Sequence, residues 1–315
     1  PASPRRQAPE AEVEEEEGPL VATALREQAA ELGAMRAQLA AEREEALKAR
    51  RQLLARERML DAILRCPATS CSFAELLAGQ CEYFAQGLAY VRSLPDFGTL
   101  QHFVDFQGPA RCYCLACHRQ RGDACTYCRA GKTYALPVGW VRFPLKAGGA
   151  QASGVGAFSS WHVAFHGTHP GALRDILTTN RLVKPGDRVA SLQGRAVGVR
   201  DGHFQRPFLR WNEFLEAHEV FDPQQIFFSP SIRYCDLPTF TSETDFIFKG
   251  APCRGKVALR LRVRPGTYKV GQQTVGACGT LDPSVPNSQI EWYTDGAEHA
   301  GHILTDLMVK TRELL

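Results

Sequence analysis

The sequence lacks several features that would place it in a common functional class. No apolar run approaches the roughly 20 residues that cross a bilayer, and there is no Asn-x-Ser/Thr glycosylation site. Lysine and arginine total 37 against 34 aspartates and glutamates, so no strong basic field favours nucleic acid as a partner. Neither a Gly-x-Gly-x-x-Gly after a strand, nor a Walker loop, nor a nucleophile elbow is present. These absences argue against a membrane-spanning protein, a classical dinucleotide or triphosphate fold, and a serine hydrolase.

The composition indicates a folded protein. Of the 315 residues, 44% are hydrophobic and 9% are aromatic, which is enough for one large core or two smaller ones. Because the sequence begins at Pro1, we expect it to be part of a longer chain. Eleven cysteines are present, and five of them fall between Cys112 and Cys128. Such crowding favours a metal site in a reducing compartment over a disulfide framework, so we expect a cytoplasmic protein.

The first 65 residues predict a linker followed by a long helix. Residues 1–19 are poor in apolar side chains and carry an acidic run, which is typical of a disordered linker. Residues 20–65 contain no proline, and apolar residues recur at every seventh position, at Leu25, Leu32, Leu39, Ala46, Leu53 and Leu60. This repeat favours a coiled coil that binds protein partners, with a parallel homodimer as one form. The alternative is a long solvated helix that packs its leucine stripe on the folded part.

Residues 66–157 are expected to form a helical and zinc-binding segment. The form of a capping box at Ser72–Glu75 predicts an amphipathic helix that ends before Pro95. The cysteine-rich stretch that follows contains two Cys-x-x-Cys knuckles, Cys114/Cys117 and Cys125/Cys128. Each knuckle directs two thiolates toward one point, so the four predict a tetrahedral, structural zinc site. Cys112 and His118 are alternates for one ligand, and reduced thiols without metal are the competing interpretation.

The C-terminal segment, residues 158–315, predicts a mixed α+β domain with a sheet core. A run rich in glycine, alanine and serine at 147–160 indicates a linker or a mobile loop, and we expect the domain boundary to lie there. The connection 183–224 is expected to be loop-rich and functional. In the strand expected at 256–264, Arg260, Arg262 and Arg264 alternate with apolar residues, so we expect them to face solvent. Strands are expected near residues 161–166, 225–229, 256–264, 267–270, 289–293 and 302–310.

Three stretches of this segment follow an order that is typical of one enzyme group. They are Phe165–Thr168 at a strand end, Ile226–Tyr234 as a strand that leads into a short helix, and a late strand that contains Glu291. This order resembles the poly(ADP-ribose) polymerase group of ADP-ribosyltransferases, which has a His-Gly-Ser/Thr strand end, a Ser-x-x-Tyr helix and a late catalytic glutamate. Together with the cysteine cluster, the stretches look like the C-terminal region of neuralized-like proteins. The resemblance covers about residues 100–315.

The resemblance implies an ADP-ribosyltransferase-like split β-sheet and NAD as a substrate. It gives Glu291 the role of the carboxylate that stabilises the charge on the ribose, and it places His166 on a ribose hydroxyl. The backbone of Gly167 and the hydroxyl of Ser231 would bind the nicotinamide amide, and Tyr234 would stack on its ring. The implied activity is transfer of ADP-ribose to a protein or another acceptor.

One position departs from the family pattern. The stacking tyrosine of the family corresponds to Phe227, which has no hydroxyl to donate. Polymer formation is therefore not expected, and mono-ADP-ribosylation is the preferred function. Thr168 completes the expected NAD-binding set.

The competing interpretation gives each of these residues a structural role. His166 would be satisfied by local backbone, Glu291 would be a solvated strand charge, and Ser231 and Tyr234 would be a helix cap and a packed aromatic. The domain would then be an inactive scaffold for protein interaction. Under either interpretation, the resemblance to neuralized-like proteins implies centrosomal or ubiquitin-pathway partners.

Overall fold

The computed structural model describes residues 30–43, 45, 81–188, 206–295 and 301–314. The chain divides into two units, residues 1–54 and 55–315. In the first unit, residues 30–43 and 45 are helical, and Leu32, Met35 and Leu39 are exposed. These residues are part of the helix expected over 20–65, and the coiled-coil dimer stays a prediction. The linker at 1–19 and the capping box at Ser72–Glu75 lie outside the described residues.

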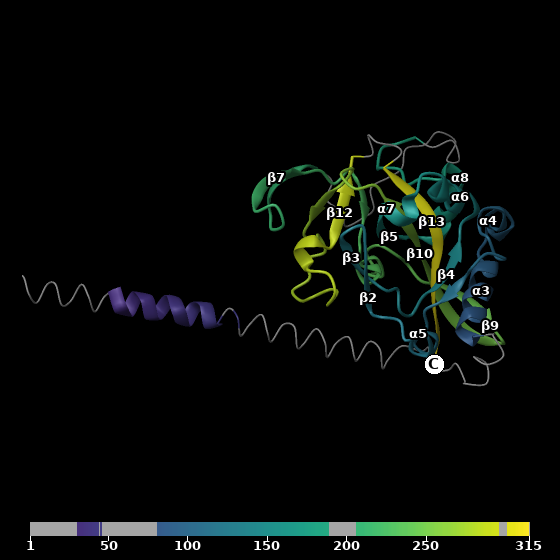
Figure 1. Ribbon diagram of the computed structural model, residues 1–315. Coiled ribbons are helices and arrows are strands. Elements are labelled where there is room, and N and C mark those ends of the chain that lie inside the picture. Colours follow the sequence, from purple (N-terminus) through teal and green to yellow (C-terminus); the bar gives the residue numbers. More distant parts are fainter. Residues whose placement is uncertain (1–29, 44, 46–80, 189–205, 296–300, 315) are drawn as a thin grey trace, which may run out of the picture. The chain divides into compact units, whose positions relative to one another are not determined.

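The second unit is built on a six-stranded antiparallel sheet (Figure 1). Its strand order is β1-β4-β13-β10-β5, and β9 also pairs with β10. The strands are β1 (Arg111–Cys112), β4 (Val141–Pro144), β5 (His162–Thr168), β9 (Thr244–Phe248), β10 (Ala251–Val263) and β13 (His302–Glu313). Strand β10 pairs with β13 on one edge and with β5 and β9 on the other, so it is the centre of the sheet.

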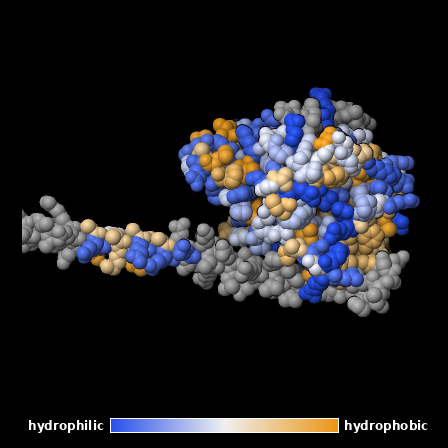
Figure 2. Space-filling view, viewed as in Figure 1, coloured by the Kyte–Doolittle hydropathy of each residue, from blue (hydrophilic) through white to orange (hydrophobic). Residues whose placement is uncertain are grey.

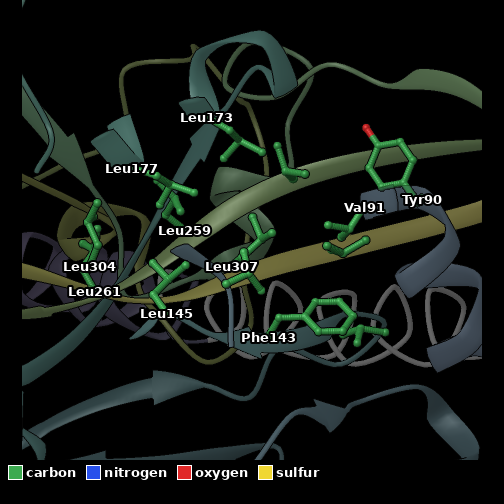
Figure 3. Close-up of a cluster of buried hydrophobic side chains, with 14 of the residues drawn as sticks. Tyr90, Val91, Phe143, Leu145, Leu173, Leu177, Leu259, Leu261, Leu304 and Leu307 are labelled. Carbon is green, nitrogen blue, oxygen red and sulfur yellow. The ribbon is translucent and has the colours of Figure 1, made fainter. Parts of the chain in front are cut away.

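One face of this sheet carries the main hydrophobic core. Strand β10 places Val257, Leu259, Leu261 and Val263 on this face, because alternate side chains of a strand share a face. Figure 3 shows Leu259 and Leu261 in one cluster with Leu173 and Leu177. Four helices contribute side chains to this core: α3 (Glu82–Ser93), α4 (Phe97–Phe103), α5 (Leu115–Arg121) and α8 (Leu173–Thr179).

A second, three-stranded sheet adjoins the first. Its order is β11-β12-β8, formed by β8 (Ile226–Phe228), β11 (Lys269–Gly271) and β12 (Glu291–Thr294). An antiparallel bridge between Phe165 and Ser229 joins β5 to the end of β8. This bridge links the strand that carries the His-Gly-Thr motif to the sheet that carries Glu291.

Two hairpins and several short helices complete the unit. The hairpins are β2 (Thr126–Arg129) with β3 (Lys132–Ala135), and β6 (Phe208–Asn212) with β7 (Ala217–Phe221). The helices are α5 (Leu115–Arg121), α6 (Lys146–Gly154), α7 (Ala157–Ser160), α9 (Ile232–Cys235), and the 3₁₀ turns η2 (Pro170–Ala172) and η4 (Asn287–Gln289). None of the described helices combines the length and the apolar character that a membrane span needs.

The expected mixed α+β class is confirmed, and its sheets are antiparallel. The stretch 147–160, however, is helical in α6 and α7, and is not a linker. A side chain at Gly148 would collide with the carbonyl oxygen of Leu304, so the small residues allow α6 to pack directly on β13. Strand β4, before the expected boundary, pairs with β13, after it. The two sides of the expected domain boundary therefore share one sheet.

The arginines of β10 also differ from expectation. Arg264 is exposed, but Arg260 and Arg262 are only 5% and 6% exposed. Their face of the sheet is covered by a second cluster that includes Tyr134 of β3 and Ile232 of α9. The alternation of apolar residues and arginines correctly predicts which side chains of β10 share a face. It does not predict that both faces of the strand are buried.

The core generates a stability prediction. The change Leu259→Ala removes a fully buried side chain from the centre of β10 and is expected to lower the free energy of unfolding by about 2–5 kcal/mol. Leu209→Ala, at a strand position that is 68% exposed, is the control and is expected to change it by less than about 0.5 kcal/mol. Urea unfolding measures both values, and equal losses would contradict the described core.

Candidate functional site

A group of four buried cysteines lies at the start of the second unit. Cys81, Cys112, Cys114 and Cys117 have sulfur atoms that all lie within 4.8 Å of one another. The sulfur of Cys81 is 3.6 Å from that of Cys112 and 3.6 Å from that of Cys114. Cys81 is the N-cap residue of α3, and Cys112 ends β1. The group therefore joins two elements that are distant in sequence.

Local structure explains how the Cys114/Cys117 knuckle forms. Cys114 is the N-cap residue of α5, and its sulfur accepts a hydrogen bond from the backbone N–H of Cys117 at 3.5 Å. The sulfur of Cys112 accepts from the N–H of Cys114 at 3.3 Å. Both bonds place sulfur atoms at the positive end of a helix, which stabilises thiolates there.

The second predicted knuckle does not join this group. Cys125 and Cys128 are exposed, because Thr126–Arg129 is a strand that pairs with β3. Cys128 lies in β2 and Cys125 lies immediately before it, and neither sulfur atom is part of the group of four buried thiols. Their places are taken by the alternate Cys112 and by Cys81. The other alternate, His118, is buried near Asp123, with 3.9 Å between Nδ1 and Oδ2.

The thiols of this group shift one another's pKa values in opposite directions. Hydrogen bonds from the thiols of Cys112 and Cys81 lower the pKa of Cys114 to about 5. The pKa of Cys117 is also lowered, chiefly by the thiol of Cys112, whereas that of Cys112 is raised by its three neighbours. A tetrahedral zinc ion with Zn–S bonds of about 2.3 Å requires sulfur atoms about 3.8 Å apart. The buried group therefore could hold a structural metal such as zinc.

A second polar group surrounds Glu291. This residue begins β12 and is only 2% exposed. Its Oε2 accepts a hydrogen bond from the hydroxyl of Tyr234 at 2.6 Å and another from the hydroxyl of Thr274 at 2.8 Å. The backbone N–H of Thr274 donates to the hydroxyl of Tyr234 at 3.2 Å. Its Oε1 is buried and has no hydrogen-bond partner among the described residues.

Ser231 stands next to this group at the start of α9. As the N-cap residue, it accepts from the backbone N–H of Tyr234 at 3.2 Å. Its hydroxyl donates to Oδ2 of Asp282, which is itself buried. The structural role expected in the competing interpretation is therefore present for Ser231. Tyr234 also packs as an aromatic, with its ring 4.8 Å from that of Phe240.

The His-Gly-Thr strand end lies across the bridge from β8. Nδ1 of His166 is 2.8 Å from the carbonyl oxygen of Phe227, and since a carbonyl can only accept, this nitrogen carries the hydrogen. A side chain at Gly167 would collide with the carbonyl oxygen of Cys235, so close packing of α9 on β5 accounts for the glycine. Thr168 is buried, and its carbonyl accepts from the hydroxyl of Thr241 at 3.0 Å.

The aromatic ring of Phe227 faces the β6–β7 hairpin. Its centroid is 5.8 Å from that of Phe221 and 6.1 Å from that of Tyr293. The hydroxyl of Tyr293 donates to the carboxylate of Glu219, which also accepts from Arg210 at 2.9 Å. This network fixes the hairpin to β12, two residues beyond Glu291.

Burial controls the charge of Glu291. It raises the pKa of the carboxyl from 4.5 to about 7, although hydrogen bonds from Tyr234 and Thr274 act in the opposite direction. The pKa of Tyr234 is raised as well, first by burial and then by the negative charge of Glu291. Near neutral pH, this carboxyl can therefore exchange between its protonated and its ionised form.

Three residues of these groups escaped sequence reasoning. Cys81 stands 31 residues before Cys112, so no knuckle spacing marks it. Thr274 and Asp282 lie in the connection between β11 and β12, outside the motifs. Asp282 precedes Pro283, and an acidic residue before proline indicates a turn. This pattern does not predict the contact between Asp282 and Ser231.

Comparison with known proteins adds no identification. No family model and no solved structure matches this chain. The geometry of the two groups therefore carries the functional argument.

The raised pKa of Glu291 predicts a specific pH dependence of stability. Its folded pKa of about 7 exceeds 4.5, so the folded state binds more protons than the unfolded state between these values. This contribution to stability is lost as the pH rises through about 7. Glu291→Gln is expected to remove this loss and to be more stable than the wild type at pH 8, by up to about 3 kcal/mol.

Chemical denaturation at pH 5, 6, 7 and 8 measures this effect. Glu216→Gln, on the exposed tip of the β6–β7 hairpin, is the matched control and is expected to keep the wild-type profile. If Glu291→Gln also keeps the wild-type profile, the buried carboxyl does not titrate in this range.

Proposed function

We propose that the second unit is an NAD-dependent ADP-ribosyltransferase that transfers single ADP-ribose units to a protein or another acceptor. The observation that supports this most directly is the buried Glu291 carboxylate, whose Oε2 accepts from Tyr234 and whose Oε1 has no hydrogen-bond partner within the described part of the chain. A buried acceptor without a partner is costly, and a ribose hydroxyl would satisfy it. The family resemblance of these residues supports the same assignment.

The chemistry suits a carboxylate in this position. The bond between the ribose C1′ and the nicotinamide nitrogen breaks, and nicotinamide leaves with the electron pair. The ribose passes through an oxocarbenium-like state, as in glycoside cleavage. Ionised Glu291 would stabilise that positive charge and orient the acceptor, whose nucleophile bonds to C1′ and loses its proton. Tyr234 would hold the carboxylate in place through its 2.6 Å hydrogen bond.

NAD binding requires changes in the hydrogen bonds of this group. The hydroxyl of Ser231 donates to Asp282, and that of Thr274 donates to Glu291. Both acceptors of these bonds are buried. For Ser231 to reach the nicotinamide amide, its bond to Asp282 has to break. The connection between β11 and β12, which carries Thr274 and Asp282, would therefore move when substrate binds.

A second candidate function is an inactive scaffold for protein interaction. Ser231, Tyr234 and Glu291 are 0%, 3% and 2% exposed, so the group is closed to solvent. The outer face of the β6–β7 hairpin, in contrast, exposes Leu209 and Val220, and apolar side chains gather there in Figure 2. These two are direct cross-strand partners, and exposed apolar faces of this kind mark protein-binding surfaces.

We also propose that zinc occupies the group of Cys81, Cys112, Cys114 and Cys117. Four thiolates leave no open coordination position, so the metal would be structural. It would tie the start of α3 to β1 and α5. Since α3 supplies Tyr90 and Val91 to the main core, the metal would stabilise the domain as a whole.

The transferase proposal predicts that NAD raises the melting temperature and that the protein labels an acceptor with ADP-ribose. Glu291→Gln is expected to lower the transfer rate by at least about 100-fold while the variant stays folded. Because the carboxyl must be ionised, the wild-type rate is expected to rise with pH through about 7. Glu216→Gln should retain full activity. Absence of both labelling and a thermal shift with NAD would favour the scaffold.

The zinc proposal predicts one zinc ion per folded chain by metal analysis. Cys81→Ser is expected to lose the metal and to lower the melting temperature, as is chelation of the wild type. The double variant Cys125→Ser/Cys128→Ser is the control, since both thiols are exposed, and it should retain one zinc. Metal loss in the control with retention in Cys81→Ser would restore the two-knuckle site and refute this one.

A further inference from the structure

Arg262 is a buried cation that forms no salt bridge with any residue in the part of the chain that the structure describes. It lies on the central strand β10, where its backbone partners are Val163 of β5 and Ile303 of β13. It is 6% exposed, and Nε and Nη1 have no hydrogen-bond partner among the described residues. Its guanidinium carbon is 5.1 Å from the ring centroid of Phe158, which satisfies one face of the group but none of its donors. Leaving a buried charge unpaired is strongly destabilising.

The β2–β3 hairpin covers this part of the sheet. The carbonyl oxygen of Ala130, in the hairpin turn, is 3.1 Å from Nε2 of His162 on β5. Tyr134 of the hairpin packs in the same cluster as Val163, the backbone partner of Arg262. The hairpin forms a two-stranded sheet of its own, so it can shift relative to β10 without breaking the strand pairing of the main sheet.

The charges around Arg262 are positive. Burial, followed by the positive charges of Arg260 and Arg129, lowers its pKa to about 10. Asp306, the β13 residue opposite Arg260, accepts a hydrogen bond from Arg260 at 2.7 Å and lies 3.5 Å from Arg142. Asp306 is therefore already shared between two guanidinium groups.

The unsatisfied atoms of this region share one property. Nε and Nη1 of Arg262, Nε of Arg129 and the hydroxyl of Tyr134 are all buried without a hydrogen-bond partner among the described residues. The three nitrogen atoms can only donate, and the hydroxyl can donate as well. What complements them is an anion with several acceptor oxygens.

We infer that the β2–β3 hairpin and strand β10 together form a binding site for a phosphate group, held by Arg262, Arg129 and Tyr134. Guanidinium groups bind phosphate through two parallel charge-assisted hydrogen bonds, and a hydroxyl supplies a third donor. The phosphate group would enter beside Arg129, which is half-buried, as the hairpin moves outward. This site shares no residue with the Glu291 group and is independent of the proposed transferase activity.

The test compares melting temperatures of the full chain in phosphate-free buffer with sodium phosphate or with sodium chloride at equal ionic strength. Phosphate is expected to raise the wild-type melting temperature and chloride is not. Arg262→Gln is expected to raise the melting temperature in phosphate-free buffer, because the unpaired charge is gone, and to abolish the response to phosphate. A purely structural arginine would instead lower the melting temperature under both conditions, which would overturn the inference.

Two further variants keep the test decisive if Arg262→Gln does not fold. Tyr134→Phe removes only a hydroxyl, and Arg129→Gln removes a half-buried charge; each is expected to weaken phosphate binding by roughly tenfold or more in calorimetry. Arg254→Gln, an exposed position paired with Asp245, is the control and should bind like the wild type. Titration with ADP then distinguishes two sources of the phosphate group. Tighter binding of ADP than of inorganic phosphate indicates a nucleotide phosphate, and weaker binding of ADP indicates a free phosphate anion. Wild-type affinity in both Tyr134→Phe and Arg129→Gln would refute the site.

Discussion

Strand β10 is the constraint on which the rest of the second unit depends. It pairs on both edges, and its side chains are buried on both faces from Val257 to Val263. Each of its paired backbone groups is therefore satisfied within the sheet, and a polar side chain without a partner is costly on either face. The same strand holds β5, and with it the His-Gly-Thr strand end, in register. The positions of His166 and Gly167 are fixed by this pairing.

Among the residues that the structure describes, one β-bridge joins the two sheets, and the Glu291 group is next to it. The backbone groups of Phe165 and Ser229 exchange two hydrogen bonds, at 2.7 and 2.9 Å. The hydroxyl of Ser229 donates to the carbonyl oxygen of Ile290, the residue before Glu291. A small change in the register of β5 would therefore move both Glu291 and α9. Packing of α9 against Gly167 adds to this coupling, because it leaves no room for a side chain there.

Sequence reasoning succeeded where a local pattern determines the structure. The alternation of β10, the strand before His166 and the α+β class follow from periodicity, and the Cys114/Cys117 knuckle follows from spacing. It failed where the structure depends on contact with an element that is distant in the sequence. Cys81 joins its group through the packing of α3, and Arg262 is buried by a hairpin more than 120 residues before it in the chain. The small residues near Gly148 reflect close packing on β13, which composition alone cannot distinguish from flexibility.

The closed state of the Glu291 group bears on both candidate functions. Each hydrogen bond that Thr274 and Asp282 make there also occupies a group that NAD would need. An enzyme with this arrangement would exchange internal hydrogen bonds for substrate hydrogen bonds, and the net gain in binding would be small for each exchanged bond. The unsatisfied Oε1 of Glu291 is the exception, since a substrate hydroxyl there displaces no internal partner among the described residues. A buried acceptor without a partner costs stability and makes no contact with a protein partner. It would therefore not contribute to the function of a scaffold. Among the described residues, the carboxylate oxygen that lacks a partner is the observation that supports the proposed transferase over the scaffold.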